Sequence, residues 1–70
     1  MLKYKINVLE ELKSAGYNTN RLRSEKILSE STIQKLRHGI LISIVSLERI
    51  CDILEKEPGE IIERRKEDEN

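Results

Sequence analysis

The sequence predicts an all-α domain of five short helices, and three observations support this fold class. The 70 residues include 21 Leu, Ile and Val but no Phe or Trp, so the core must be built from branched aliphatic side chains. One Pro and three Gly are too few turn-forming residues for a sandwich of short strands. Apolar residues also recur at helical spacing in several segments. A chain of this length allows one compact domain.

The first helix is predicted from the spacing of Val8, Leu12 and Ala15. Gly16 follows as a left-handed stop, because glycine adopts a positive φ without steric cost. We expect Tyr17 to pack against that stop. Asn18 then provides an N-cap for the second helix, whose central apolar residue is Leu22 and which we expect to end near residues 25–26.

Ser29 is the N-cap expected for the third helix, which follows the second after a tight turn. Ile33 and Leu36 are spaced by three and face the core. Gly39 is expected to end this helix in the left-handed conformation. The sequence therefore predicts two short capped helices in immediate succession, which is a helix-turn-helix.

The fourth helix is predicted to begin after the N-cap Ser43, and Pro58 suits the first turn of a fifth helix. Ile61 and Ile62 are its expected buried residues. The apolar face expected for the fourth helix consists of Ile44, Leu47, Ile50, Cys51 and Leu54. We place the domain at residues 1–65 and expect a charged, frayed tail at residues 66–70.

The formal net charge is zero, but the charges are unevenly distributed along the chain. Residues 1–40 hold eight Lys or Arg against four Glu, and residues 41–70 hold five against nine acidic residues. A basic face can therefore exist on a neutral protein. No signal peptide or membrane-spanning segment is evident, and we expect a cytoplasmic protein. One His and one Cys, Cys51, favour neither a metal site nor catalysis, and no cofactor or small-molecule ligand is predicted.

The ordered positions of these residues resemble the DNA-binding domain of the phage Cro and repressor family, also called the XRE family. The resemblance covers about residues 4 to 64 and needs no insertion. It implies a compact five-helix, lambda-repressor-like domain that is not an enzyme. The residues that carry it are Gly16, Tyr17, Asn18, Leu22, residues 28–33, Leu36, Gly39, Ser43, Leu47, Glu48, Ile50, Cys51, Leu54 and residues 58–61.

The resemblance implies that the exposed side of the third helix reads base edges in the major groove. Lys35 can donate to guanine, and Glu30 can accept from cytosine or merely stabilise the positive end of the helix dipole. Gln34 can reach a base or a phosphate. The full set implied to read bases is Ser29, Glu30, Ser31, Gln34 and Lys35.

Contacts with DNA phosphates are expected mainly from the start of the second helix, where side-chain donors and positive charges are concentrated. Lys26 adds a further positive charge nearby. The residues expected to contact phosphates are Asn18, Thr19, Arg21, Arg23, Thr32 and His38.

Two features depart from the family pattern. Ile27 stands in the turn where the family usually has Gly, and a β-branched residue strongly disfavours a positive φ. Either the turn is built differently or the second helix is longer than usual. The apolar loop of residues 40–42 replaces polar residues, and so small a core cannot hold all three side chains.

We therefore predict a sequence-specific, repressor-like transcriptional regulator that binds double-stranded DNA as a homodimer. One such domain buries too little surface for tight specific binding. The dimer contact would come from the loop of residues 40–42, from the start of the fifth helix, or from both. Two alternatives keep the fold: an interaction adaptor or antirepressor without DNA function, and the antitoxin of a toxin–antitoxin pair.

Overall fold

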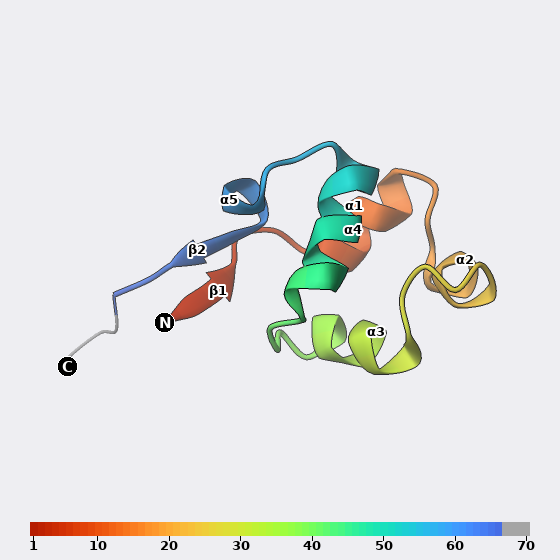
Figure 1. Ribbon diagram of the computed structural model, residues 1–70, viewed down its shortest axis with the longest axis horizontal. Helices are drawn as coiled ribbons and strands as arrows, with labels where there is room; N and C mark the ends of the chain where they lie inside the picture. Colours follow the sequence, from red (N-terminus) through yellow and green to blue (C-terminus); the bar gives the residue numbers. More distant parts are fainter. Residues whose placement is uncertain (67–70) are drawn as a thin grey trace.

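The computed structural model describes residues 1–66 and contains the five predicted helices in the predicted order. Helices α1 and α4 lie side by side, α3 crosses below them, and α2 flanks α3 (Figure 1). The elements are β1 (Leu2–Tyr4), α1 (Val8–Ser14), α2 (Thr19–Ser24), α3 (Glu30–Arg37), α4 (Ile44–Leu54), α5 (Pro58–Ile61) and β2 (Ile62–Arg64).

The all-α prediction is wrong in one respect, because β1 and β2 form a small antiparallel sheet. Leu2 pairs with Arg64 and Tyr4 with Ile62, so the two ends of the domain are joined. The backbone N–H of Lys5 extends the contact by donating to the Ile61 carbonyl at 2.8 Å. Ile62 was predicted to be a buried residue of α5. It is instead a half-buried residue of β2. The sheet lies on the opposite side of the helices from α2 (Figure 1).

The core is made of aliphatic side chains that come from every helix. Leu22 is the only buried residue of α2, and Ile33 is the only one of α3. Cys51 packs against this core but is only partly buried. Ile44 is 77% exposed, so its predicted place on the buried face of α4 is wrong. The buried residues are Val8, Leu12, Leu22, Leu28, Ile33, Leu47, Ile50 and Ile61.

The predicted helix boundaries depend on local hydrogen bonds that the structure confirms. Each predicted N-cap accepts a backbone N–H from the residue three positions further on: Asn18 from Arg21, Ser29 from Thr32 and Ser43 from Ser46. Gly16 and Gly39 both have a positive φ, at 94° and 73°. Asn7, which the sequence did not single out, caps α1 in the same way.

The turn between α2 and α3 is built differently from the expected glycine turn. Lys26, and not Ile27, takes the left-handed conformation with a φ of 56°, and α2 ends already at Ser24. The carbonyl of Ile27 accepts a hydrogen bond of 2.9 Å from Nη1 of Arg49 in α4. The β-branched residue thus avoids a positive φ, and a distant arginine fixes its backbone.

Lys26→Gly should raise the free energy of unfolding by up to about 1 kcal/mol. The left-handed conformation costs a residue with a Cβ about 1–2 kcal/mol, and glycine removes this cost. Glycine also makes the unfolded chain more flexible, and this entropy offsets about half of the gain. Chemical denaturation measures the difference. Lys26→Ala is the control, because it removes the same charge and keeps the strain. A glycine variant less stable than the alanine variant would contradict the prediction.

The apolar loop after α3 places one of its three residues against the core, as expected for so small a domain. Ile42 packs on the core, whereas Ile40 and Leu41 are 53% and 40% exposed. Of the predicted tail at residues 66–70, only Lys66 is described, and residues 67–70 lie outside the described residues. None of the described helices combines the length and the apolar character needed to cross a membrane.

Candidate nucleic-acid interface

The outward face of α3 carries a stripe of polar side chains. Ser31, Lys35 and His38 are exposed and are spaced by four and three residues, so they lie along one side of the helix. Ile33 is fully buried and Leu36 half-buried on the opposite side, which fixes the helix on the domain. Three of the predicted contact residues therefore form one accessible row.

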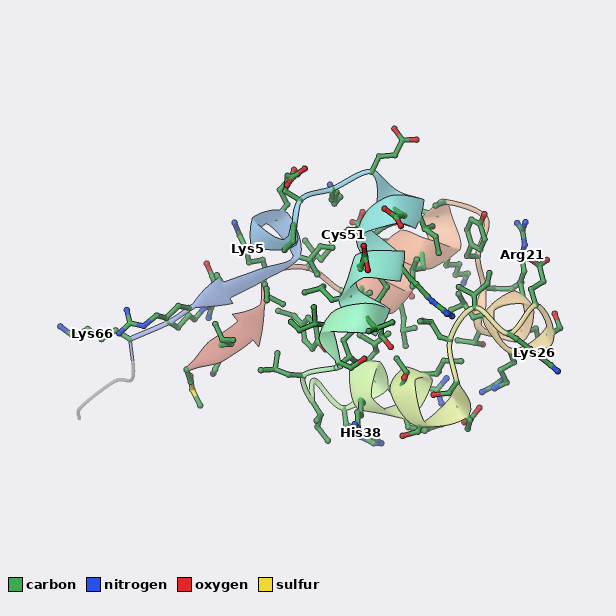
Figure 2. The ribbon with its side chains drawn as sticks, viewed as in Figure 1. Lys5, Arg21, Lys26, His38, Cys51 and Lys66 are labelled. Carbon is green, nitrogen blue, oxygen red and sulfur yellow. The ribbon has the colours of Figure 1, made fainter. Side chains whose placement is uncertain are left out.

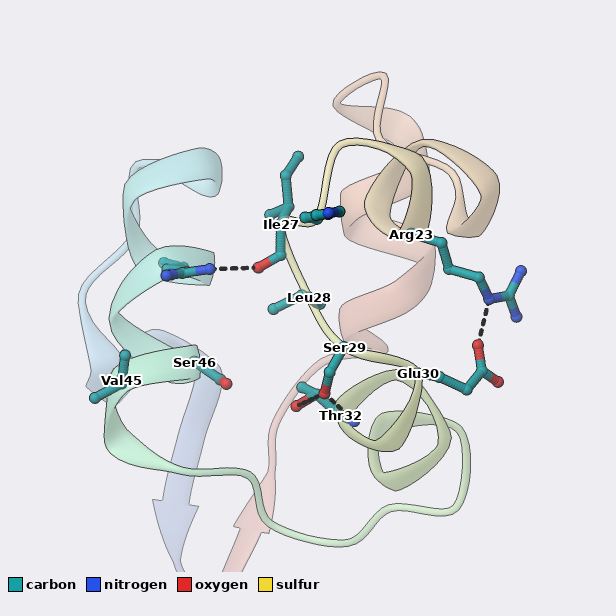
Figure 3. A pocket seen from close by; sticks show the side chains of 10 residues that line it. Arg23, Ile27, Leu28, Ser29, Glu30, Thr32, Val45 and Ser46 are labelled. Atoms are coloured by element: carbon teal, nitrogen blue, oxygen red, sulfur yellow. Dashed lines mark hydrogen bonds and ion pairs between the residues drawn. The ribbon is translucent and has the colours of Figure 1, made fainter.

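A second row of side chains on α3, which contains Glu30 and Gln34, is linked to α2 by hydrogen bonds. Glu30 accepts a hydrogen bond from Nε of Arg23 through one carboxylate oxygen (Figure 3). Its other carboxylate oxygen accepts a hydrogen bond of 2.7 Å from Nε2 of Gln34. The pKa of the Glu30 carboxyl is lowered, first by the hydrogen bond from Arg23 and then by that from Gln34. Each carboxylate oxygen of Glu30 thus accepts one hydrogen bond, and the Gln34 amide keeps its second N–H as a donor and its carbonyl oxygen as an acceptor.

The link between Glu30 and Arg23 should make stability depend on pH. A lowered pKa in the folded state means that the stabilisation is present at neutral pH and is lost as the pH falls through that pKa. We expect the difference in unfolding free energy between wild type and Glu30→Gln to shrink as the pH falls from neutral to below 4.5, which is the ordinary pKa of a glutamate carboxyl. Denaturation at a series of pH values measures it, and a difference that is independent of pH would contradict the prediction.

A groove of about 610 Å³ opens between the turn, the start of α3 and the start of α4 (Figure 3). Three cationic side chains line it, from Arg23, Lys26 and Arg49, against the single carboxylate of Glu30. Hydroxyl groups complete the polar lining, supplied by Ser29, Thr32 and Ser46. This cationic groove thus has a net positive lining beside the first turn of α3, and such a lining attracts anions.

The Ser29 and Thr32 side chains in this groove are also bonded to each other. Ser29 Oγ accepts the backbone N–H of Thr32 and donates to Thr32 Oγ1 at 3.0 Å. Ser29 is therefore a helix cap in the first place. Its position at the rim of the groove still leaves it close to any molecule that lies along α3.

A second groove, of about 310 Å³, lies between α1, the start of α2 and the end of α3. It brings Lys13 and Arg37 together with Asn18 and Thr19, against one carboxylate, that of Glu10. The Asn18 side-chain oxygen caps α2, and this leaves its amide N–H groups available as donors. Cationic side chains thus flank α3 at both of its ends.

Arg21 is the predicted contact residue that the structure does not bring to this surface. Its Nε pairs with Glu25 at 2.9 Å and its Nη1 donates to the Gly16 carbonyl at 3.0 Å. Its guanidinium also lies 4.2 Å from the centre of the Tyr17 ring. Figure 2 shows Arg21 directed away from the side on which His38 lies. Arg21 joins α1 to α2 and fixes the junction around Gly16.

Among the cationic and hydroxyl side chains of the two grooves, four were not predicted as contact residues from the sequence: Lys13, Arg37, Ser46 and Arg49. Arg49 is 22 positions from Ile27, the residue it bonds, so only the tertiary fold brings it to the turn. Arg37 does have a signal in the sequence, since it shares a helical row with Glu30 and Gln34. No sequence signal points to Lys13, because it lies on the polar side of α1 and not in α2 or α3.

The comparisons agree with this geometry. A family model described as the Cro/C1-type HTH DNA-binding domain matches residues 7–67, a range that includes all five helices. Neither the curated proteins nor the solved structures gave a match. The family resemblance stated above is confirmed, and the chain belongs to the Cro/C1-type helix-turn-helix family of DNA-binding domains.

Proposed function

We propose that this protein is a sequence-specific, repressor-like transcriptional regulator that places α3 in the major groove of double-stranded DNA. One observation carries the proposal: the exposed row of Ser31, Lys35 and His38 lies between two cationic grooves. The major groove is about 12 Å wide and admits one helix, with phosphates along both of its edges. A polar helix with positive charge at each end is complementary to that arrangement.

In this proposal Lys35 and Ser31 read base edges directly, since both are exposed on the outward row. Lysine donates well to guanine O6 and N7, and serine can donate or accept. Gln34 offers its carbonyl oxygen and one N–H, because its other N–H donates to Glu30. Glu30 positions Gln34 in the free protein and has acceptor sites left for cytosine N4, because each of its oxygens accepts only one hydrogen bond.

Phosphates on one strand would contact the first groove, through Arg23, Lys26 and Arg49. Phosphates across the major groove would contact the second, through Lys13, Arg37 and the Asn18 amide. Thr19, Thr32 and His38 lie beside these groups and add donors. Such contacts set the position of the protein on the duplex and make its affinity depend on salt.

Selection of bound sites from a pool of random duplexes, repeated at two salt concentrations, tests this proposal. We expect an enriched motif with two-fold symmetry and an affinity that falls as salt rises. Lys26→Ala, which removes one cationic side chain of the first groove, should lower the slope of log affinity against log salt by about 1. Lys56→Ala, at the opposite end of α4 from α3, is the matched control and should leave the slope unchanged.

A second candidate function is an interaction module, as an adaptor, antirepressor or antitoxin, and the exposed apolar side chains of residues 40–45 favour it. The selection distinguishes the regulator from an adaptor or antirepressor that does not bind DNA. Absence of duplex binding even at low salt would favour the adaptor, because phosphate binders are strongest there. An antitoxin would bind both duplex and a protein partner, and would therefore give the enriched motif.

A further inference from the structure

The hydrogen bonds that run from α2 through Glu30 to Gln34 contribute little to the stability of the fold. Arg23 donates to one carboxylate oxygen of Glu30 (Figure 3). Gln34 donates to the other oxygen at 2.7 Å. The side chains of Arg23 and Glu30 are 39% and 55% exposed, and ion pairs as exposed as this one add little to stability. What these bonds do determine is the orientation of the Gln34 amide.

Glu30 determines which end of the Gln34 amide faces it. An ionised carboxylate only accepts hydrogen bonds, so the amide nitrogen must point toward Glu30 and the amide oxygen must point away. Arg23 holds the carboxylate from the neighbouring helix. Because one N–H is given to Glu30, the amide keeps one N–H as a donor and its carbonyl oxygen as an acceptor. Gln34 therefore presents one donor and one acceptor in a fixed order.

Gln34 lies next to the outward row of α3. It is three residues from Ser31 and four from His38, and residues at both spacings are neighbours on the surface of a helix. Its neighbour on the other side is Glu30, one turn closer to the start of α3. The Gln34 amide is thus beside the side chains that enter the major groove in the proposed function, on which this inference rests.

We propose that Glu30 positions the Gln34 amide so that Gln34 reads adenine. In the major groove adenine presents the acceptor N7 beside the donor N6 amino group. The free N–H of Gln34 donates to N7, and its carbonyl oxygen accepts from N6. Guanine presents two acceptors, O6 and N7, so one of them would face the carbonyl oxygen. Cytosine and thymine each offer only one polar group at this edge.

Without Glu30 the Gln34 amide is free to turn over. A half-turn about its last side-chain torsion exchanges the oxygen and the nitrogen, and this torsion has two broad minima. The turned amide would place its oxygen against adenine N7, where two acceptors repel each other. A side chain that is not held must also be ordered when it binds, which weakens its contact. Glu30 acts on adenine through Gln34, so it is a positioning residue for this base.

The test is the base preference at each position of the selected duplex, compared between wild type, Gln34→Ala and Glu30→Ala. We expect one position in each half-site at which wild type prefers adenine by about tenfold or more, and at which Gln34→Ala has no preference. Glu30→Ala should lower the preference at that same position by about threefold to tenfold. In the double variant it should add nothing to the loss. Relaxation of a different position in Glu30→Ala, with adenine still preferred at the first, would mean that Glu30 reads a base itself, and would overturn the inference.

Glu25→Ala is the matched control, because Glu25 is also an exposed carboxylate paired with an arginine of α2, Arg21. It removes the same charge and should keep the adenine preference. A selected motif with no adenine position that depends on Gln34, or an adenine preference unchanged in Glu30→Ala, would overturn the inference and leave the proposed function standing. A wild type that binds no duplex would refute both.

The motion of the Gln34 amide in the free protein provides a test that needs no DNA. Gln34 is the only glutamine in the sequence, so its side-chain amide signal in an NMR spectrum has no other glutamine signal to be confused with. We expect ¹⁵N relaxation to show an ordered amide in wild type and in Glu25→Ala, and a mobile amide in Glu30→Ala. An amide as mobile in wild type as in Glu30→Ala would overturn the inference whatever the duplex measurements show.

Discussion

Leu22→Ala should destabilise the domain by about 3 kcal/mol and abolish DNA binding. Removing a fully buried leucine typically costs 2–5 kcal/mol, because apolar contacts are lost and a cavity remains. Leu22 has no exposed surface and is the only buried residue of α2. A helix of six residues does not persist in water without such an anchor. A domain of this size has a total stability of roughly 4–10 kcal/mol, so the loss is a large fraction of it.

Chemical denaturation measures the loss, and amide hydrogen exchange shows where it occurs. We expect the amides of α2 to lose protection first, because no other side chain of that helix is buried in the core. Ile44→Ala is the control, since it deletes as many carbon atoms from a side chain that is 77% exposed. Its effect should stay within about 0.5 kcal/mol. Equal losses in the two variants would show that Leu22 does not anchor α2.

The parts of the fold that the sequence predicted correctly depend on interactions within a few residues. Asn18, Ser29 and Ser43 bond to amides three positions further on, so the chemistry of the cap is visible in the sequence. Gly16 and Gly39 were predictable for the same reason, since a positive φ is a property of a single residue.

The errors come from contacts between distant residues. The strands Leu2–Tyr4 and Ile62–Arg64 are each three residues long, which is too short for an alternating pattern to be recognised. Their pairing depends on the helices bringing the two ends of the chain together. Ile44 fits the helical spacing of α4, yet it lies at the first turn, beyond the reach of the core. Helical periodicity predicts which side of the helix a residue faces, but it does not predict how deeply that residue is buried.

The candidate site also has one part that local sequence patterns predict and another that depends on contacts between distant residues. The exposed row of α3 follows from helical periodicity once Ile33 and Leu36 are assigned to the core. The grooves do not, because each combines cationic side chains from two different helices. Arg21 and Arg23 have the same charge and neighbouring positions in the sequence. They face different sides of α2, so one fixes Gly16 while the other lines a groove beside α3.

Lys35→Ala should weaken binding to the selected duplex by about 1–3 kcal/mol, which is roughly a tenfold to hundredfold loss. Lys35 is exposed at the centre of the outward row, so its truncation removes a donor without disturbing the core. Competition binding against a duplex of scrambled sequence measures how much of the loss is specific. Denaturation of the variant, which should match wild type within about 0.5 kcal/mol, serves as the folding control.

The two duplexes separate a base contact from a phosphate contact. If Lys35 reads a base, the affinity for the selected duplex falls and that for the scrambled duplex falls much less. A lysine that contacts only phosphate would weaken both duplexes equally and lower the salt slope by about 1. Lys35→Arg keeps the charge but changes the donor geometry, so for a base-reading lysine it should restore scrambled binding more fully than selected binding. Equal losses on both duplexes would remove Lys35 from the residues proposed to read bases.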